Sequence, residues 1–410
     1  MHSRRRSLAL TAATTFALAS SLLAISCRDD STAPKANNAG EGYVLPEGGV
    51  FTRGALLGSI AACVTEKTRA FQSSVRTFAT SVTSATQDPT LHPQAELAWK
   101  SAMAEWQVLE ALRFGPAAPK ALPGGKDLRD LIYSWPLRGP CLVDEALASK
   151  VYESPKFAEG LVTTRTFLAA EYLLFHRDPT NACAATSKIN SEGTWSALGA
   201  GEIETRKIAY ANAVASDLLV RANALADAWD PTRGNFAGDL ANPGGKGSAF
   251  GSEAFALNSV SDALFYVDAE LKDEKIGRPA GLYDCTSGTC PDSVESLYAG
   301  SSKDHVRHNL EGFRILFLGC GPGASGLGFD DYLEALGQRS LAVAMENALT
   351  DAFTALDAIE EPDLVPALAT DPESVRRLHA AVKALTDLLK TQFVSILDLE
   401  LPQKIEGDND

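Results

Sequence analysis

Apolar residues in the first half of the chain recur at spacings of three, four or seven positions, which is the period of one face of an α-helix. The pattern predicts a long helix through 56–82, a second over 93–114, a short one over 128–135 and a fourth over 164–176. Proline at the start of the second and Gly-Pro after its end fit helix boundaries. The residues that carry the first two helices are Leu56, Ile60, Val64, Phe71, Val75, Phe78, Val82, Trp99, Met103, Trp106 and Leu109.

The helical period returns after a polar, irregular stretch at 181–194. It runs through 208–229, 257–271, 306–317, 330–359 and 373–398, with spacers rich in glycine and proline at 230–248 and 320–328. Alternating runs of strand length are not convincing anywhere. We therefore predict an all-α protein of two helical bundles, at 49–180 and 195–402, an arrangement that a duplication would also produce.

The predicted helix over 164–176 contains a glutamate, Glu171, among bulky apolar residues. Phe167, Leu168, Leu174 and Phe175 lie three or four positions from it and so share its side of the helix. A carboxylate in such surroundings is costly unless something neutralises it. Glu171 thus needs a basic or hydrogen-bonding partner from elsewhere in the fold.

The N-terminus has the pattern of a bacterial export signal, with three arginines followed by an Ala-rich apolar run. Small residues before Cys27 resemble a lipobox, so we predict a lipoprotein signal peptide at 1–26, lipidation of Cys27 and a flexible tether at 27–48. Ordinary signal-peptide cleavage nearby is the alternative. These features predict a protein of the bacterial cell envelope, lipid-anchored in the periplasm or outer membrane.

The charge and the cysteines of the chain bear on its possible partners, disulfides and metal sites. The net charge of −15 argues against nucleic acid as a partner. An even number of cysteines follows Cys27, which in an exported chain suggests three disulfides. Cys285 and Cys290 bracket a tight turn and are predicted to pair, whereas Cys63, Cys141, Cys183 and Cys320 leave three pairings open. The cysteine spacing fits no zinc site.

Six segments of the chain, in order, resemble segments of the imelysin family, which is also catalogued as a peptidase family. They are AWKSAMAEWQVLEALRFGP (98–116), LRDLIYSWPLRGPCLVDEAL (128–147), AAEYLLF (169–175), ELKDEKIGRPAGL (270–282), VESLYAGSSKDHVRHNLEGF (294–313) and GLGFDDYLEALG (326–337). The resemblance implies two helical bundles, a site near their junction and a link to iron acquisition, with iron or another divalent metal as ligand.

The hallmark of that family is GxHxxE, and its glutamate falls on Glu171 here. The histidine position holds Leu168 and the glycine position holds Thr166. A His and a Glu at i and i+3 can bind one metal together, whereas leucine offers no ligand atom. Glu171 therefore lacks the histidine that would bind a metal ion together with it. Candidate cations to neutralise Glu171 are Arg138, Arg165, Lys275 and Arg278.

Each candidate site residue also has a structural interpretation. Glu171 is either a site carboxylate or part of a buried ion pair that fixes helix register. Asp144 either faces the same cleft or caps a helix. Glu295 and Ser296 match a family segment, but acids and hydroxyls are also common at helix starts. His305 and His308 have a spacing that permits joint metal coordination, although basic neighbours oppose a cation.

Recognisable catalytic motifs are missing from the sequence. HExxH and GxSxG do not occur, and oxidised cysteines offer no thiol nucleophile. The main hypothesis is therefore a lipid-anchored binding protein for a metal ion or metal chelate, with an envelope transport partner. Its ligand-binding residues would be Asp144, Glu171, Glu295, Ser296, Arg138, Lys275 and Arg278. The alternatives are a non-catalytic scaffold for another envelope protein and a metal-dependent peptidase.

Overall fold

A computed structural model describes residues 50–321, 326–399 and 402 of the chain. The predicted signal peptide, the lipidation site Cys27 and the tether lie outside these residues. The described part consists of helices and their connections, and it contains no β-strand. The all-α class predicted from the apolar period is therefore confirmed. Within the described residues, no helix combines the length and apolar character that a membrane span needs.

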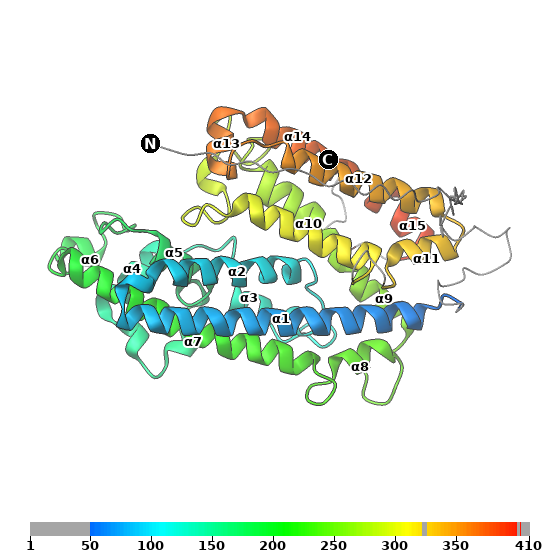
Figure 1. The fold of residues 1–410 in the computed structure, drawn as a ribbon, viewed down its shortest axis with the longest axis horizontal. Helices are drawn as coiled ribbons and strands as arrows, with labels where there is room; N and C mark the ends of the chain where they lie inside the picture. Colours follow the sequence, from blue (N-terminus) through cyan, green and yellow to red (C-terminus); the bar gives the residue numbers. More distant parts are fainter. Residues whose placement is uncertain (1–49, 322–325, 400–401, 403–410) are drawn as a thin grey trace, which may run out of the picture. The chain divides into compact units, whose positions relative to one another are not determined.

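The first half of the described chain is built around helix α1 (Figure 1). Thr52 begins α1 by accepting the backbone N–H of Ala55 on its hydroxyl, 3.0 Å away. The apolar face predicted from the sequence is buried, and it packs against α2 and α7. The helices are α1 (Arg53–Gln87), α2 (His92–Glu110), α3 (Leu128–Ile132), α4 (Pro140–Ser149), α5 (Phe167–Phe175), α6 (Lys188–Ser191), α7 (Gly199–Trp229) and α8 (Phe236–Ala241).

The second half contains the helices that follow residue 250. Helix α10 packs on α2 and so joins the two halves, while α12 and α14 pack on each other. The helices are α9 (Glu253–Ser261), α10 (Ser302–Leu318), α11 (Phe329–Ala335), α12 (Arg339–Asp357), α13 (Leu364–Thr370), α14 (Pro372–Leu388) and α15 (Val394–Leu397). Two π-helices belong to this half. Along the chain, η7 (Val267–Gly277) lies between α9 and α10, and η9 (Leu389–Phe393) lies between α14 and α15.

Helix α7 differs most from its predicted place. The sequence assigned it to the C-terminal bundle, but α7 lies along α1 and also contacts α5 (Figure 1). By its contacts it belongs with the helices before residue 180, because its buried face completes the apolar surroundings of α1. The described residues, from 50 onward, all belong to one compact unit.

Some predicted helices are also shorter than the apolar period indicated. The helix predicted over 330–359 is divided into α11 and α12 at Gly337, whose φ of 74° lies in the left-handed region that glycine tolerates. The helix predicted over 93–114 ends at Glu110. The helix predicted over 373–398 changes to the π-helix η9 before its end.

Three disulfides connect the six cysteines after Cys27. Cys285 pairs with Cys290, as the tight turn predicted. The two pairs that the sequence left open are Cys63 with Cys320, and Cys141 with Cys183. The first of these links α1 to the chain just after α10, across a sequence separation of 257 residues.

Candidate functional site

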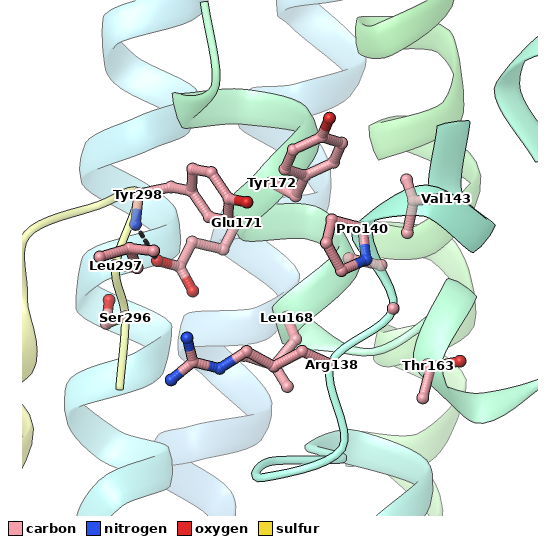
Figure 2. A pocket seen from close by; sticks show the side chains of 12 residues that line it. Arg138, Pro140, Val143, Thr163, Leu168, Glu171, Tyr172, Ser296, Leu297 and Tyr298 are labelled. Carbon is pink, nitrogen blue, oxygen red and sulfur yellow. Dashed lines mark hydrogen bonds between the residues drawn. The ribbon is translucent and has the colours of Figure 1, made fainter. Parts of the chain in front are cut away.

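Glu171 lies in the middle of α5 and is buried, with 2% of its surface exposed. Its Oε1 atom accepts two backbone hydrogen bonds, from the N–H groups of Tyr298 and Ala299, both at 3.0 Å. Figure 2 shows the bond from Tyr298. These two peptides belong to the second half of the chain. The carboxylate predicted to need a partner from elsewhere in the fold therefore finds hydrogen-bond donors there.

None of the basic residues proposed as partners forms an ion pair with Glu171. Arg165 pairs with Asp217 at 2.9 Å. Lys275 and Arg278 also have other carboxylate partners, as described below. The prediction of a cationic partner for Glu171 is thus not met, because peptide N–H groups already lie against the carboxylate. Within the described residues Glu171 has no ion pair.

The pKa of the Glu171 carboxyl is raised above its ordinary value. Burial is the main cause, because a charged carboxylate loses its hydration there. The N–H groups of Ala299 and Tyr298, the nearby His305 and the Ser296 hydroxyl act in the opposite direction, since they favour the charged form. Burial outweighs them, so the site holds a carboxyl that protonates more readily than a surface glutamate.

A cavity of about 140 Å³ lies beside Glu171. Its walls come from the chain just before α4, from α4 and α5, and from the segment that leads to Tyr298 (Figure 2). Most of the lining is apolar or aromatic, whereas the polar groups are few. The lining residues are Arg138, Gly139, Pro140, Val143, Thr163, Leu168, Ala169, Glu171, Tyr172, Ser296, Leu297 and Tyr298.

Ser296 occupies a tight turn on one wall of this cavity. Its φ of 54° is in the left-handed region, and its carbonyl accepts the N–H of Gly300 at 3.0 Å. This turn presents the next N–H groups along the chain to Glu171. The Ser296 hydroxyl is buried beside the Glu171 carboxylate, whose charged form it favours, and it has no other hydrogen-bond partner among the described residues. A hydroxyl can both donate and accept, so it retains capacity for a further hydrogen bond.

Arg138 lies on another wall, where it is held by backbone carbonyls. Its two η nitrogens donate to the carbonyls of Asp292 at 3.0 Å, of Ser293 at 3.1 Å and of Val294. Arg138 also lines a second, more open cavity of about 430 Å³. The predicted site residue Arg278 lines that second cavity and pairs with Glu274 at 3.3 Å, away from Glu171.

Asp144 is buried within α4 and holds a wall residue in place. Its carboxylate accepts the hydroxyl of Tyr172 at 2.9 and 3.1 Å and the N–H of Ala182 at 2.7 Å. Burial raises the pKa of Asp144 to about 6, although these hydrogen bonds oppose the shift. Asp144 does not cap its own helix, because its backbone donor lies far along the chain. It positions Tyr172, which lines the cavity, and is not itself among the lining residues.

Glu295 and Lys275 lie together in a buried polar cluster, which we define as Gln107, Glu110, Lys275, Glu295, His305 and Asn309. Lys275 Nζ lies 2.9 Å from Glu295 Oε2 and 3.3 Å from Glu110 Oε2. It also donates to Gln107 at 2.7 Å and to Asn309 at 2.9 Å. The π-helix η7 carries Lys275 into this position.

The charge of Glu295 is compensated on both oxygens. Oε1 accepts the hydroxyl of Tyr133 at 2.6 Å and the amide of Gln107 at 3.0 Å. Burial alone raises the pKa of Glu295, but Lys275 and His305 lower it by more, so the carboxyl is ionised. No residue of the buried polar cluster lines the cavity, although Glu295 is the neighbour of Ser296 in sequence. Glu295 is also not at a helix start, because α10 begins at Ser302.

His305 and His308, whose spacing would permit joint metal coordination, point to different partners. His305 is buried, with its Nδ1 atom 3.2 Å from Glu295, whereas the Nδ1 atom of the half-buried His308 lies 2.7 Å from the carbonyl of Asp304. Among the described residues, one group of three potential metal ligands lies close together, namely Cys141, Glu145 and Cys183, and its two cysteines form a disulfide. The described side chains thus provide no preformed site for a bare metal ion.

Two aromatic residues of the cavity were not predicted from sequence. Tyr172 and Tyr298 lie edge to face with ring centroids 5.0 Å apart, and Tyr172 stacks on His176 at 4.8 Å. Both lie in segments that resembled the family, next to Glu171 and Ser296 in sequence. Their adjacency to predicted site residues was the available signal.

The family model described as Imelysin matches residues 59–392, which is most of the chain. The chain belongs to the imelysin family. Among solved structures, this imelysin is similar to a protein described as an iron-regulated protein A precursor from Parabacteroides distasonis. That match has 15% identity and a TM-score of 0.66, and it covers 88% of this chain and 97% of the other.

A second solved structure is an imelysin-like protein from Psychrobacter arcticum. It shares 15% identity with this chain at a TM-score of 0.62, and the match covers 85% of this chain and 96% of the other. At such identities the likeness establishes the fold. Among curated proteins, none matches this chain.

Proposed function

We propose that this imelysin is a binding protein of the bacterial cell envelope that works in iron acquisition and holds its ligand in the Glu171 cavity without transforming it. The observation that carries the proposal is the cavity itself. It combines largely apolar walls with a buried hydroxyl and a buried carboxylate, and this carboxylate forms no ion pair within the described residues. A few polar groups in an apolar pocket are typical of sites for small ligands. The description of one similar structure as iron-regulated supports the iron connection.

The ligand atoms around the cavity do not fit a bare iron ion. Glu171 offers one carboxylate and Ser296 one hydroxyl, and Leu168 stands where the family motif has its histidine. Iron and other divalent transition metals need several nitrogen or oxygen ligands. The ligand in this proposal is therefore a chelate that brings most of its own donor atoms to the metal.

Titration calorimetry tests the proposal. Ferric nitrilotriacetate is expected to bind the purified protein more tightly than ferrous ion alone. Glu171→Ala should weaken chelate binding at least about tenfold, because it removes the cavity's acceptor. Glu159→Ala, at an exposed glutamate remote from the cavity lining, is the matched control and should bind as wild type. An absence of binding by every form of iron to the wild-type protein would refute the proposal.

The proposed cell-envelope location depends on lipidation of Cys27. Metabolic labelling with a palmitate analogue should modify the wild-type protein and leave Cys27→Ala unlabelled. Labelling that survives the substitution would contradict a lipid anchor at this position.

A second candidate function is a scaffold for another envelope protein. Its supporting observation is a set of exposed apolar side chains within one stretch of the chain, namely Leu137 at 65%, Leu142 at 39%, Val151 at 46% and Leu161 at 63% exposure. In this case the same envelope protein should co-purify with wild type and with Glu171→Ala. A peptidase is the third candidate, and chelator-sensitive cleavage of casein by the purified protein would support it.

A further inference from the structure

The cavity beside Glu171 is bordered by two opposite charges. Glu171 contributes a carboxylate and Arg138 contributes a guanidinium. Among the described residues neither side chain takes part in an ion pair, and no salt bridge joins one to the other. Backbone groups form hydrogen bonds with both charges, as N–H donors at Glu171 and as carbonyl acceptors at Arg138. His305 and the Ser296 hydroxyl also favour the charged form of Glu171.

Both charged groups retain capacity for a ligand. The backbone bonds to Glu171 fall on Oε1, which leaves its second oxygen without a backbone donor. The η nitrogens of Arg138 donate to carbonyls, whereas its Nε atom has no hydrogen bond within the described residues. Arg138 is half-buried, so its charge is accessible from the cavity.

Ser296 provides a second, independent observation. Its side chain is 1% exposed, and its hydroxyl lies beside Glu171, where it favours the charged form of the carboxyl (Figure 2). A hydroxyl can both donate and accept, and this one has no further partner among the described residues, so a ligand group can share it with Glu171.

We propose that the cavity recognises a small amino carboxylic acid in its zwitterionic form, either free or as a terminal group of a larger ligand. The ammonium group binds Glu171 and the Ser296 hydroxyl, and the carboxylate binds Arg138. The aliphatic part lies against Leu168 and Val143. This inference rests on the proposed function, because it names the chemical group that the same cavity binds.

Complementary charge decides between a zwitterion and simpler ligands. An amine without a carboxylate would bring its positive charge into a cavity that Arg138 also lines, and a carboxylate without an amine would meet Glu171. A zwitterion satisfies both groups at once. The rings of Tyr172 and Tyr298 also favour an ammonium group, because a cation is attracted to an aromatic face.

The size of the cavity limits the ligand. A protein cavity of roughly 150 Å³ can hold benzene, which has six non-hydrogen atoms. The cavity here is similar in volume, at about 140 Å³. It is therefore suited to a ligand, or a ligand end, of roughly six to eight non-hydrogen atoms.

Four compounds of matched length test the inference by calorimetry on the purified protein. L-Norvaline and 5-aminopentanoate carry both charges at different separations, butylamine lacks the carboxylate, and pentanoate lacks the amine. At least one amino acid should bind, and butylamine and pentanoate should each bind at least about tenfold more weakly than it. The preferred isomer reports the separation of the two charges in the site.

Variants locate the binding. Glu171→Gln should weaken the preferred amino acid at least about tenfold, with a smaller loss for Ser296→Ala, which removes a single oxygen and preserves the fold. Glu159→Gln should bind as wild type. Butylamine or pentanoate binding as tightly as the amino acids, no binding of either amino acid, or full binding by Glu171→Gln would each overturn the inference.

These measurements distinguish failure of the zwitterion inference from failure of the proposed function. If ferric nitrilotriacetate binds in a manner that depends on Glu171 but neither amino acid binds, the proposed function stands and the zwitterion inference falls. If an amino acid binds while no form of iron does, the iron role falls and the zwitterion inference stands.

Discussion

Replacing Lys275 by methionine tests the account of the buried polar cluster. Lys275 is 1% exposed, and its Nζ atom lies between the carboxylates of Glu110 and Glu295. Methionine has a similar length but no charge, so both carboxylates would lose a buried cation. Breaking a buried ion pair by removing one partner typically costs about 3–5 kcal/mol. We expect a loss of that size in the free energy of unfolding, since Arg129 still compensates Glu110 at 2.6 Å.

Urea unfolding followed by circular dichroism at pH 7 measures this loss. Lys120→Met is the matched control, because Lys120 forms an exposed pair with Asp127 at 3.0 Å. That variant should unfold at the same urea concentration as wild type. If Lys275→Met also unfolds like wild type, the cluster is not held together by the charge of Lys275 and the reasoning fails.

Three further predictions concern other parts of the chain. In the folded protein the pKa of Asp144 is about 6, above its ordinary value of 3.8, so the folded state binds the proton more tightly than the unfolded state. The free energy of unfolding should therefore fall as the pH rises from about 4 to about 6. Asp144→Asn should reduce this fall, and urea unfolding at several pH values would contradict the assignment if the variant and wild type changed equally. Replacing Cys63 and Cys320 together by serine should destabilise the protein by about 5 kcal/mol, whereas replacing Cys285 and Cys290 should cost about 2 kcal/mol, because the first disulfide closes a much longer loop. Equal losses of stability in thermal unfolding would contradict loop entropy as the cause. Leu168→His should raise zinc affinity at least about tenfold in calorimetry, because it restores a nitrogen ligand one turn from the motif glutamate, and an unchanged affinity would show that the two side chains do not meet.

The helices were predictable from sequence wherever one apolar face is buried against a neighbour. The period carried by Leu56 through Val82 corresponds to the buried face of α1. Local features were harder to predict, because the break at Gly337 and the π-helix η7 depend on single backbone positions and not on the apolar period. The packing of α7 on α1 could also not be predicted, because the apolar pattern of a helix shows which of its faces is buried but not which other helix covers that face.

The candidate site was predictable in position but not in its contacts. An acid among apolar residues identified Glu171 as buried, and the resemblance to imelysins placed Ser296 near it. The groups that bind Glu171 are backbone N–H groups from residues 127 and 128 positions away. Any residue except proline carries such a donor, so side-chain chemistry gives no signal for it. The sequence therefore indicated basic side chains, of which Arg165, Lys275 and Arg278 form ion pairs elsewhere and Arg138 donates to backbone carbonyls.

The central claim is that the protein's ligand binds in the cavity between Glu171 and Ser296. A crystal structure of the protein grown with ferric nitrilotriacetate tests this most directly. The account predicts electron density for the chelate at the cavity, with one end of it inside and in contact with the Glu171 carboxylate and the Ser296 hydroxyl, because a volume of about 140 Å³ is too small for the whole chelate. An empty cavity with the chelate bound elsewhere on the molecule would contradict it.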